Sequence, residues 1–187
     1  MSLHRLAFLA ALVLTLAACA SRAPEPPPVA AAPLPALRRV VLVHAASGEK
    51  ADVVYHFNGT YDARALDKIS RLLRDQHTGQ IAPVDPELLD FVYDMLHRTG
   101  LPPSTEVHVT SGYRSPETNA KLVKTNRQAA RESFHIRGQA IDFHVPSLPG
   151  GTLAEIAKTM QRGGVAFYPS SGHIHLDTGP VRTWKTR

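Results

Sequence analysis

Two short segments of the chain carry side chains that are able to bind a metal ion. The first, SFHIRGQAID, covers residues 133–142, and the second, HIHLD, covers residues 173–177. Residues two apart on a β-strand share a face, so the second segment is predicted to present His173, His175 and Asp177 on one side. The apolar residues between them would then face the core.

The first segment adds another imidazole and another carboxylate. The sequence AIDFHV alternates as in a strand, and Asp142 lies on the face opposite its apolar side chains. His135 precedes this strand, and Gly138 between them permits the sharp turn that would bring the imidazole back beside Asp142. If this strand neighbours the one with His175, two imidazoles and one carboxylate converge.

Two histidines and one carboxylate form a ligand set that suits a catalytic metal ion. Zinc with three protein ligands keeps a position open for water, whose pKa falls from 15.7 toward ~7. Hydrolysis of an amide is a natural use of such a site. Non-haem iron(II) takes the same residue types, so both metals stay open. Export from the cytoplasm, which the amino-terminal residues indicate, favours the redox-inactive zinc ion.

The remaining histidines show no comparable grouping. His144 shares the predicted face of Asp142, so a role behind the metal ligands stays open for it. Ordinary surface or core roles are expected for the others, His44, His56, His77, His97 and His108.

The amino-terminal residues indicate export and lipid anchoring. Arg5 precedes an apolar run too short to cross the ~30 Å hydrocarbon layer, which is typical of a secretory signal over residues 1–18. The sequence LAAC, which ends at Cys19, resembles a bacterial lipobox, whose cysteine is acylated and becomes the new amino terminus. Two or more acyl chains hold a protein stably at a membrane. A plain signal peptide cut nearby is the alternative.

The rest of the chain divides into a tether and one domain. Residues 19–37 carry the lipidated cysteine and a proline- and alanine-rich stretch that is predicted to stay extended. Residues 38–187 are long enough to build one core. Because Cys19 is the only cysteine, no internal disulfide is expected. The net charge of +5 suits an anionic partner, and for an exported lipoprotein this is the cell wall or a membrane surface rather than nucleic acid.

Apolar periodicity predicts an α+β domain. Because strands gather at both ends of the domain instead of alternating with helices, the order favours an antiparallel sheet flanked by helices. Asp62 and Asp85 are expected to cap helices, with Pro86 in the first turn of the second helix and Gly100 at its end. The expected strands lie at 40–44, 52–57, 104–115 and 138–145, with two more within 165–184, and the expected helices lie at 62–75, 85–100, 116–125 and 152–164.

The domain contains the segments SGYRSPETNAKL, SFHIRGQAID and GGVAFYPSSGHIHLDTGPVRTW. Together these three segments resemble the YcbK-like murein endopeptidases, part of the zinc D-Ala-D-Ala peptidase group related to the hedgehog signalling domain. The resemblance implies an α+β fold with one zinc ion held by His135, Asp142 and His175. It also implies hydrolysis of peptide cross-links in peptidoglycan and a periplasmic location. An earlier segment, NGTYDARALDKISRLLRDQHTGQIAPVDPELLD, resembles the same family. The similarity therefore runs from about Arg38 to Trp184.

The resemblance also assigns residues around the metal. Arg114 matches an arginine that contacts the substrate, and its guanidinium suits a carboxylate or a developing oxyanion. An arginine that only orients its turn is the alternative. Many relatives carry the general base three residues before the last zinc histidine, where this chain has Gly172. We therefore expect His173 or Asp177 to handle the proton, and Asp177 has the alternative role of orienting a ligand histidine.

The expected function is that of a monomeric, lipid-anchored zinc endopeptidase acting on peptidoglycan stem peptides. Three alternatives stay open: a carboxypeptidase that trims terminal D-alanine, a non-catalytic peptidoglycan-binding lipoprotein, which Gly172 favours, and a zinc amidase for a non-wall peptide. An endopeptidase differs from a carboxypeptidase in having an open pocket beyond the scissile bond, which the sequence does not reveal. By analogy with enterobacterial lipoproteins, Ala20 after Cys19 favours the outer membrane.

Overall fold

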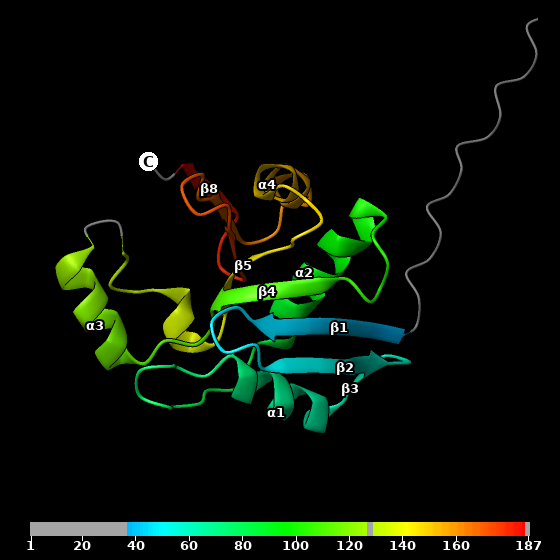
Figure 1. The fold of residues 1–187 in the computed structure, drawn as a ribbon, viewed down its shortest axis with the longest axis horizontal. Helices are drawn as coiled ribbons and strands as arrows, with labels where there is room; N and C mark the ends of the chain where they lie inside the picture. Colours follow the sequence, from blue (N-terminus) through cyan, green and yellow to red (C-terminus); the bar gives the residue numbers. More distant parts are fainter. Residues whose placement is uncertain (1–36, 127–128, 186–187) are drawn as a thin grey trace, which may run out of the picture. The chain divides into compact units, whose positions relative to one another are not determined.

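A computed structural model of the chain describes residues 37–126 and 129–185 (Figure 1). The signal peptide predicted at 1–18, the lipidation site Cys19 and nearly all of the tether predicted at 19–37 lie outside the described residues. No helix in the described ranges is long and apolar enough to cross a bilayer.

The strands of the described residues form one sheet. They are β1 (Leu37–His44), β2 (Lys50–Phe57), β3 (Thr60–Tyr61), β4 (Glu106–Ser111), β5 (Ala140–His144), β6 (Gly164–Phe167), β7 (Ile174–Asp177) and β8 (Arg182–Lys185). Their order across the sheet is β3-β2-β1-β4-β5-β7-β6-β8. Most neighbours are antiparallel, whereas β1 with β4 and β6 with β8 are parallel. The α+β class is confirmed, and the sheet is mixed because other strands intervene in the chain between the members of each parallel pair.

Two of the helices begin, and one of them ends, at the capping residues that the sequence predicts. The predicted caps are confirmed: Asp62 accepts hydrogen bonds from two backbone N–H groups of the first turn, and Asp85 accepts one from Glu87. Gly100 ends the second helix with a left-handed φ of 71°. Within the described residues the helices are α1 (Ala63–Leu72), α2 (Pro86–Thr99), α3 (Pro116–Thr125), α4 (Gly150–Thr159) and the short 3-10 helix η1 (Phe134–Arg137).

The hydrophobic core leaves one side of the central strands free for polar side chains. Helix α1 packs on β2, while α2 and α4 pack on each other and on β1, β6 and β7. The apolar residues of β5 and β7, which are Ile141, Phe143, Ile174 and Leu176, belong to this core. Because side chains alternate along a strand, Asp142, His175 and Asp177 face the opposite way, as the sequence predicted.

The region after Pro149 differs from the prediction. The sequence predicts two strands within 165–184, and the structure has three, because Arg182–Lys185 turns back and pairs parallel to β6. The helix predicted at 152–164 spans Gly150–Thr159 instead. Gln161 and Gly163 both have a φ of 52°, a left-handed conformation that is incompatible with a continuing helix.

Gly138 connects His135 to β5 and confirms the predicted turn. Its φ of 69° lies in the left-handed region that favours glycine. A Cβ at this position would also collide with the backbone carbonyl oxygen of Pro83. Both the conformation and the surrounding space therefore require glycine here.

We expect Gly138→Ala to lower the free energy of unfolding more than Gly79→Ala does. Gly79 has a φ of 72° with no atom near the position of its missing Cβ, so its replacement reports the backbone strain alone, about 1 kcal/mol. The collision with Pro83 adds to this strain, and we expect a loss of at least about 2 kcal/mol for Gly138→Ala. Denaturant unfolding measures both values. Equal losses would mean that the segment around Pro83 moves aside freely.

Candidate metal centre

Strands β5 and β7 bring the three predicted ligands together. Their antiparallel register pairs Asp142 directly with His175. The Nδ1 atom of His175 lies 2.8 Å from Oδ1 of Asp142, and Nε2 of His135 lies 3.4 Å from Oδ2 of the same carboxylate. One potential ligand atom from each residue lies within 4.8 Å of the other two. The convergence predicted from the sequence is therefore present.

Each histidine is oriented by a second hydrogen bond on its other ring nitrogen. His135 donates from Nδ1 to the carbonyl oxygen of Gly112 at 2.7 Å, so Nε2 is the nitrogen that faces Asp142 and is placed to bind a metal. Nε2 of His175 lies 2.7 Å from Oδ2 of Asp177, which leaves Nδ1 as the ligand atom. The donor set and its orientation fit a metal ion.

Asp177 lies behind His175, away from the shared ligand point. It is fully buried, and its two oxygens accept hydrogen bonds from two backbone N–H groups and from both terminal nitrogens of Arg182, at 2.9 and 2.6 Å. Burial opposes its ionisation, but the hydrogen bonds from His175 and Arg182 outweigh burial and lower the pKa of Asp177. This geometry corresponds to the orienting role that the sequence left open.

The charges of the cluster favour a bound cation. Burial lowers the pKa of His175, but hydrogen bonds to Asp142 and Asp177 raise it to about 9 overall. Burial likewise acts against ionisation of Asp142, yet the two histidines lower its pKa. Without a metal, His175 therefore holds a proton between two carboxylates, and a metal ion would displace it.

The ligand atoms open into a cleft of about 700 Å³. His173 lines this cleft, stacked on Tyr168 with ring centroids 4.3 Å apart, and its Nδ1 lies 2.7 Å from the hydroxyl of Ser171. Burial lowers the pKa of His173, so its imidazole is neutral at neutral pH and able to accept a proton. Of the two residues expected to handle a proton, His173 has its Nε2 available, whereas the oxygens of Asp177 are engaged.

Arg114 lies at the margin of the cleft, where no carboxylate of the described residues pairs with it. Its Nη1 donates to Oδ1 of Asn119 at 3.1 Å and its Nη2 donates to the hydroxyl of Ser111 at 3.3 Å. Burial lowers the pKa of Arg114, but a guanidinium stays charged in proteins. The remaining N–H groups are available to a ligand.

Several supporting residues escaped the sequence analysis. Asn119 is buried and donates to the carbonyl oxygens of Ala130 and Arg131, both at 3.1 Å, so it ties Arg114 to the segment after α3. Neither its type nor its place on a helix signals this contact. The sequence analysis also missed Arg182, which stacks over Phe134 and Trp184 while it donates to Asp177. The available signal was its spacing of two residues from Trp184, which places both side chains on one face of a strand.

Gly172, at the position where the resemblance leads one to expect an acid, has a conformation that favours glycine. Its φ is 74°, and its N–H donates to the carbonyl oxygen of Tyr168 at 2.8 Å, closing the turn before β7. A residue with a side chain would be strained in this conformation.

His144, for which a supporting role stayed open, lies beside His108 with ring centroids 5.2 Å apart.

A mixed sheet that presents two imidazoles and a carboxylate to an open cleft is an arrangement that fits a metal-dependent hydrolase. The family model Peptidase_M15_2, described as peptidoglycan L,D-endopeptidase MepK, matches residues 32–184, and the chain belongs to this family. It is 38% identical to the probable peptidoglycan L,D-endopeptidase MepK of Haemophilus influenzae over 139 residues, and these aligned residues cover 74% of each chain. It is 34% identical to the peptidoglycan L,D-endopeptidase MepK of Escherichia coli K12 over 150 residues, and these aligned residues cover 80% of this chain and 81% of the relative. The family predicted from the sequence is confirmed.

The metal-free protein is expected to lose thermal stability as the pH rises from 6.5 to about 9. The pKa of His175 is raised from 6.5 to about 9 in the folded state, so its proton stabilises the fold fully below pH 6.5 and the contribution is lost as the pH passes through 9. The carboxylates are ionised throughout this range. Thermal unfolding in excess chelator measures the decline.

His175→Gln should flatten this pH dependence, because glutamine does not titrate. His97→Gln, at an exposed histidine, should retain the decline of the parent. A melting temperature of the parent that does not change between pH 6.5 and 9 would contradict the charge arrangement described above.

Proposed function

We propose that the chain is a zinc-dependent peptidoglycan endopeptidase that hydrolyses amide bonds in cross-linked stem peptides. The observation that carries this proposal is the convergence of His135, Asp142 and His175 in an open cleft with Arg114 at its margin. The names of the relatives supply the substrate, peptidoglycan, and the internal position of the cut.

Zinc is the metal that we assign to this centre. Two histidines and a carboxylate suit zinc or iron(II), and the contact of His175 with the buried Asp177 is the carboxylate–histidine arrangement that recurs around zinc. When bound, zinc supplies Lewis acidity, which activates water and polarises the scissile carbonyl.

The residues of the chain divide the remaining tasks. The imidazole of His173 is uncharged at neutral pH, so its Nε2 accepts a proton. His173 then returns this proton to the departing amine. Arg114 donates hydrogen bonds to a substrate carboxylate or to the oxygen on which charge develops. Asp177 fixes the ring of His175, and Arg182 fixes Asp177. Asn119 and Ser111 hold the guanidinium of Arg114 in place.

The location follows from the amino-terminal sequence. A secretory signal and a lipobox support export, acylation of Cys19 and anchoring of the domain to the outer membrane on the periplasmic side. The proline-rich residues before the domain then act as a tether toward the wall. We propose that one chain is sufficient for activity, because it supplies every ligand residue itself.

The other functions raised by the sequence have weaker support. A carboxypeptidase requires a cleft that closes beyond the terminal residue, and a non-catalytic binder has no need of oriented ligand histidines. A zinc amidase for a non-wall peptide has no counterpart among the relatives named above. The endopeptidase is therefore the function that we carry forward.

Incubation of the purified protein with a dimeric, cross-linked muropeptide is expected to release its two halves, detected by mass spectrometry. Chelation should stop the reaction and added zinc should restore it. We expect His135→Ala to lower kcat/KM by at least about 100-fold, since even the loss of a residue that supports a ligand costs 10–100-fold.

The control is His97→Ala, which replaces an exposed histidine outside the cluster and should retain parental activity. Release of terminal D-alanine from an intact dimer would instead establish a carboxypeptidase. An intact dimer that remains bound to the protein would establish a non-catalytic binder.

Arg114→Lys is expected to lower kcat/KM by about 10- to 100-fold while leaving the zinc content unchanged. Lysine keeps the charge but loses the planar pair of donors that binds a carboxylate or an oxyanion. Arg98→Lys, at an exposed position, serves as the matched control. Parental kcat/KM in Arg114→Lys would show that Arg114 only orients its turn.

A further inference from the structure

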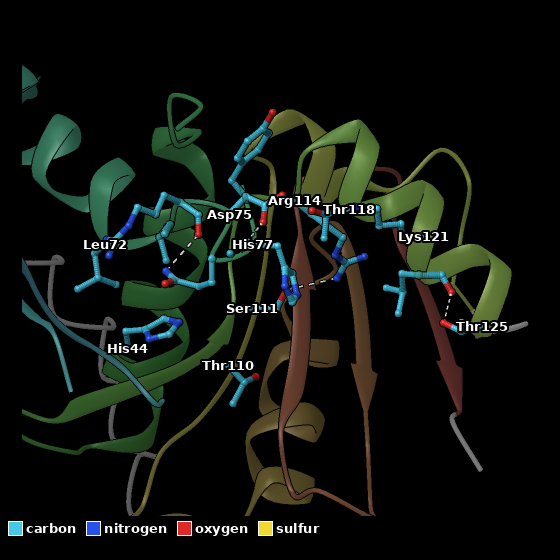
Figure 2. Close-up of a pocket in the computed structure, with 16 residues that line it drawn as sticks. His44, Leu72, Asp75, His77, Thr110, Ser111, Arg114, Thr118, Lys121 and Thr125 are labelled. Carbon is cyan, nitrogen blue, oxygen red and sulfur yellow. Dashed lines mark hydrogen bonds between the residues drawn. The ribbon is translucent and has the colours of Figure 1, made fainter. Parts of the chain in front are cut away.

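A second cavity, of about 480 Å³ (Figure 2), shares the lining residue Arg114 with the metal cleft. The end of β4 and the turn after it form the partition between them. On the side of the metal centre, Thr110 donates to the backbone carbonyl of Asp142 at 3.1 Å, and the carbonyl of Gly112 accepts from His135. Thr110 and Gly112 also line the second cavity.

The lining of the second cavity is cationic. Arg74, Arg114 and Lys121 contribute positive charges, and His77 contributes an exposed imidazole. Glu49 pairs with Arg74 at 2.8 Å and Glu117 pairs with Lys121 at 2.7 Å, but neither carboxylate lines the cavity. Each cation keeps further N–H donors for a ligand.

Asp75 is the only carboxylate among the described residues that line this cavity, and the backbone occupies its oxygens. Oδ1 accepts from the N–H groups of His77 and Thr78, and Oδ2 accepts from the N–H of Ser115 at 2.8 Å. Its role is to hold the loop after α1 against the start of α3. Burial opposes its ionisation, but these hydrogen bonds outweigh burial and lower the pKa of Asp75, so it stays ionised. Its single negative charge is set against the positive charges of Arg74, Arg114 and Lys121 in the lining.

His44 adds a buried donor to the wall. It is 8% exposed, and its Nδ1 accepts a hydrogen bond from the backbone N–H of Ser47 at 3.2 Å. In that arrangement the ring proton is on Nε2, which His44 offers as an N–H donor. Figure 2 shows His44 and His77 on the lining of the same cavity as Arg114 and Lys121.

We infer that the second cavity binds a carboxylate-bearing arm of the peptide substrate while the scissile amide lies in the metal cleft. This inference rests on the proposed function. A cross-linked substrate continues on both sides of its scissile amide, whereas the substrate of a carboxypeptidase ends shortly after it. The second cavity shares Arg114 with the metal cleft and provides room for a second arm, and its volume lies within the ~300–1,000 Å³ range of ligand sites. Its cations and N–H donors select free carboxylates.

The test compares Lys121→Gln/His77→Gln with a matched control, Lys124→Gln/His97→Gln. Both double variants make the same chemical changes at exposed positions, and Lys124 lies on the same helix as Lys121 but does not line the cavity. The substrates are a two-armed muropeptide dimer and the same cross-link with one stem cut back to its reacting residue.

We expect the ratio of kcat/KM for the two-armed substrate to that for the shortened substrate to fall about three- to tenfold in the cavity variant, through KM. The control should keep the parental ratio. A ratio in the cavity variant equal to that of the control would overturn the inference.

A binding measurement separates this inference from the proposed function. In the full chain carrying His135→Ala, a stem tetrapeptide with free carboxylates should bind about three- to tenfold more weakly when Lys121→Gln/His77→Gln is added. The amidated peptide should not respond to these changes. If the parent cleaves no muropeptide but this binding effect is found, the subsite stands and the proposed function fails. If the parent cleaves the dimer and neither the ratio nor the binding changes, the subsite fails and the proposed function stands.

Discussion

The register between β5 and β7 is the constraint on which the site depends. It places Asp142 directly opposite His175, and a shift of one strand by one residue would turn its polar side chain into the apolar core and separate the two residues. The core side of the same strands, with Ile141, Phe143 and Ile174 fully buried, penalises such a shift. The hydrophobic pattern that forms the sheet therefore also holds two of the three ligand residues in position.

The third ligand reaches this position through local geometry. His135 sits on η1, and the left-handed Gly138 returns the chain into β5. The partition between the two cavities then fixes the imidazole, because the carbonyl of Gly112 accepts its Nδ1 proton. The same turn carries Arg114. One short segment thus orients His135 and places Arg114, so under the proposed function a change in this turn would affect metal binding and substrate binding together.

The features that sequence predicted are those set by local rules. Asp62 and Asp85 cap helices because a carboxylate satisfies free N–H groups of a first turn, and the period of two in β5 and β7 gives the face of each ligand. The parallel pairing of β8 with β6 joins two segments that β7 separates in the chain, and no local pattern specifies it. Asn119 lies only five residues from Arg114, but their hydrogen bond depends on how the turn before α3 aims the guanidinium, which the residue types do not reveal. The second cavity escaped because its lining comes from segments distant in the chain, namely β1, β4, α3 and the loop after α1.

The charge balance of the centre favours the binding of a cation. Asp142 and Asp177 are both held ionised in a largely buried setting, and Arg182 neutralises only one of them. An uncompensated buried charge is costly, so the cluster takes up one more positive charge. In the metal-free protein this is the proton on His175, and a divalent ion would replace it with a larger charge at a fixed point. Because Asp177 and Arg182 keep the ring of His175 oriented in both cases, little rearrangement is needed when the proton leaves and the metal binds.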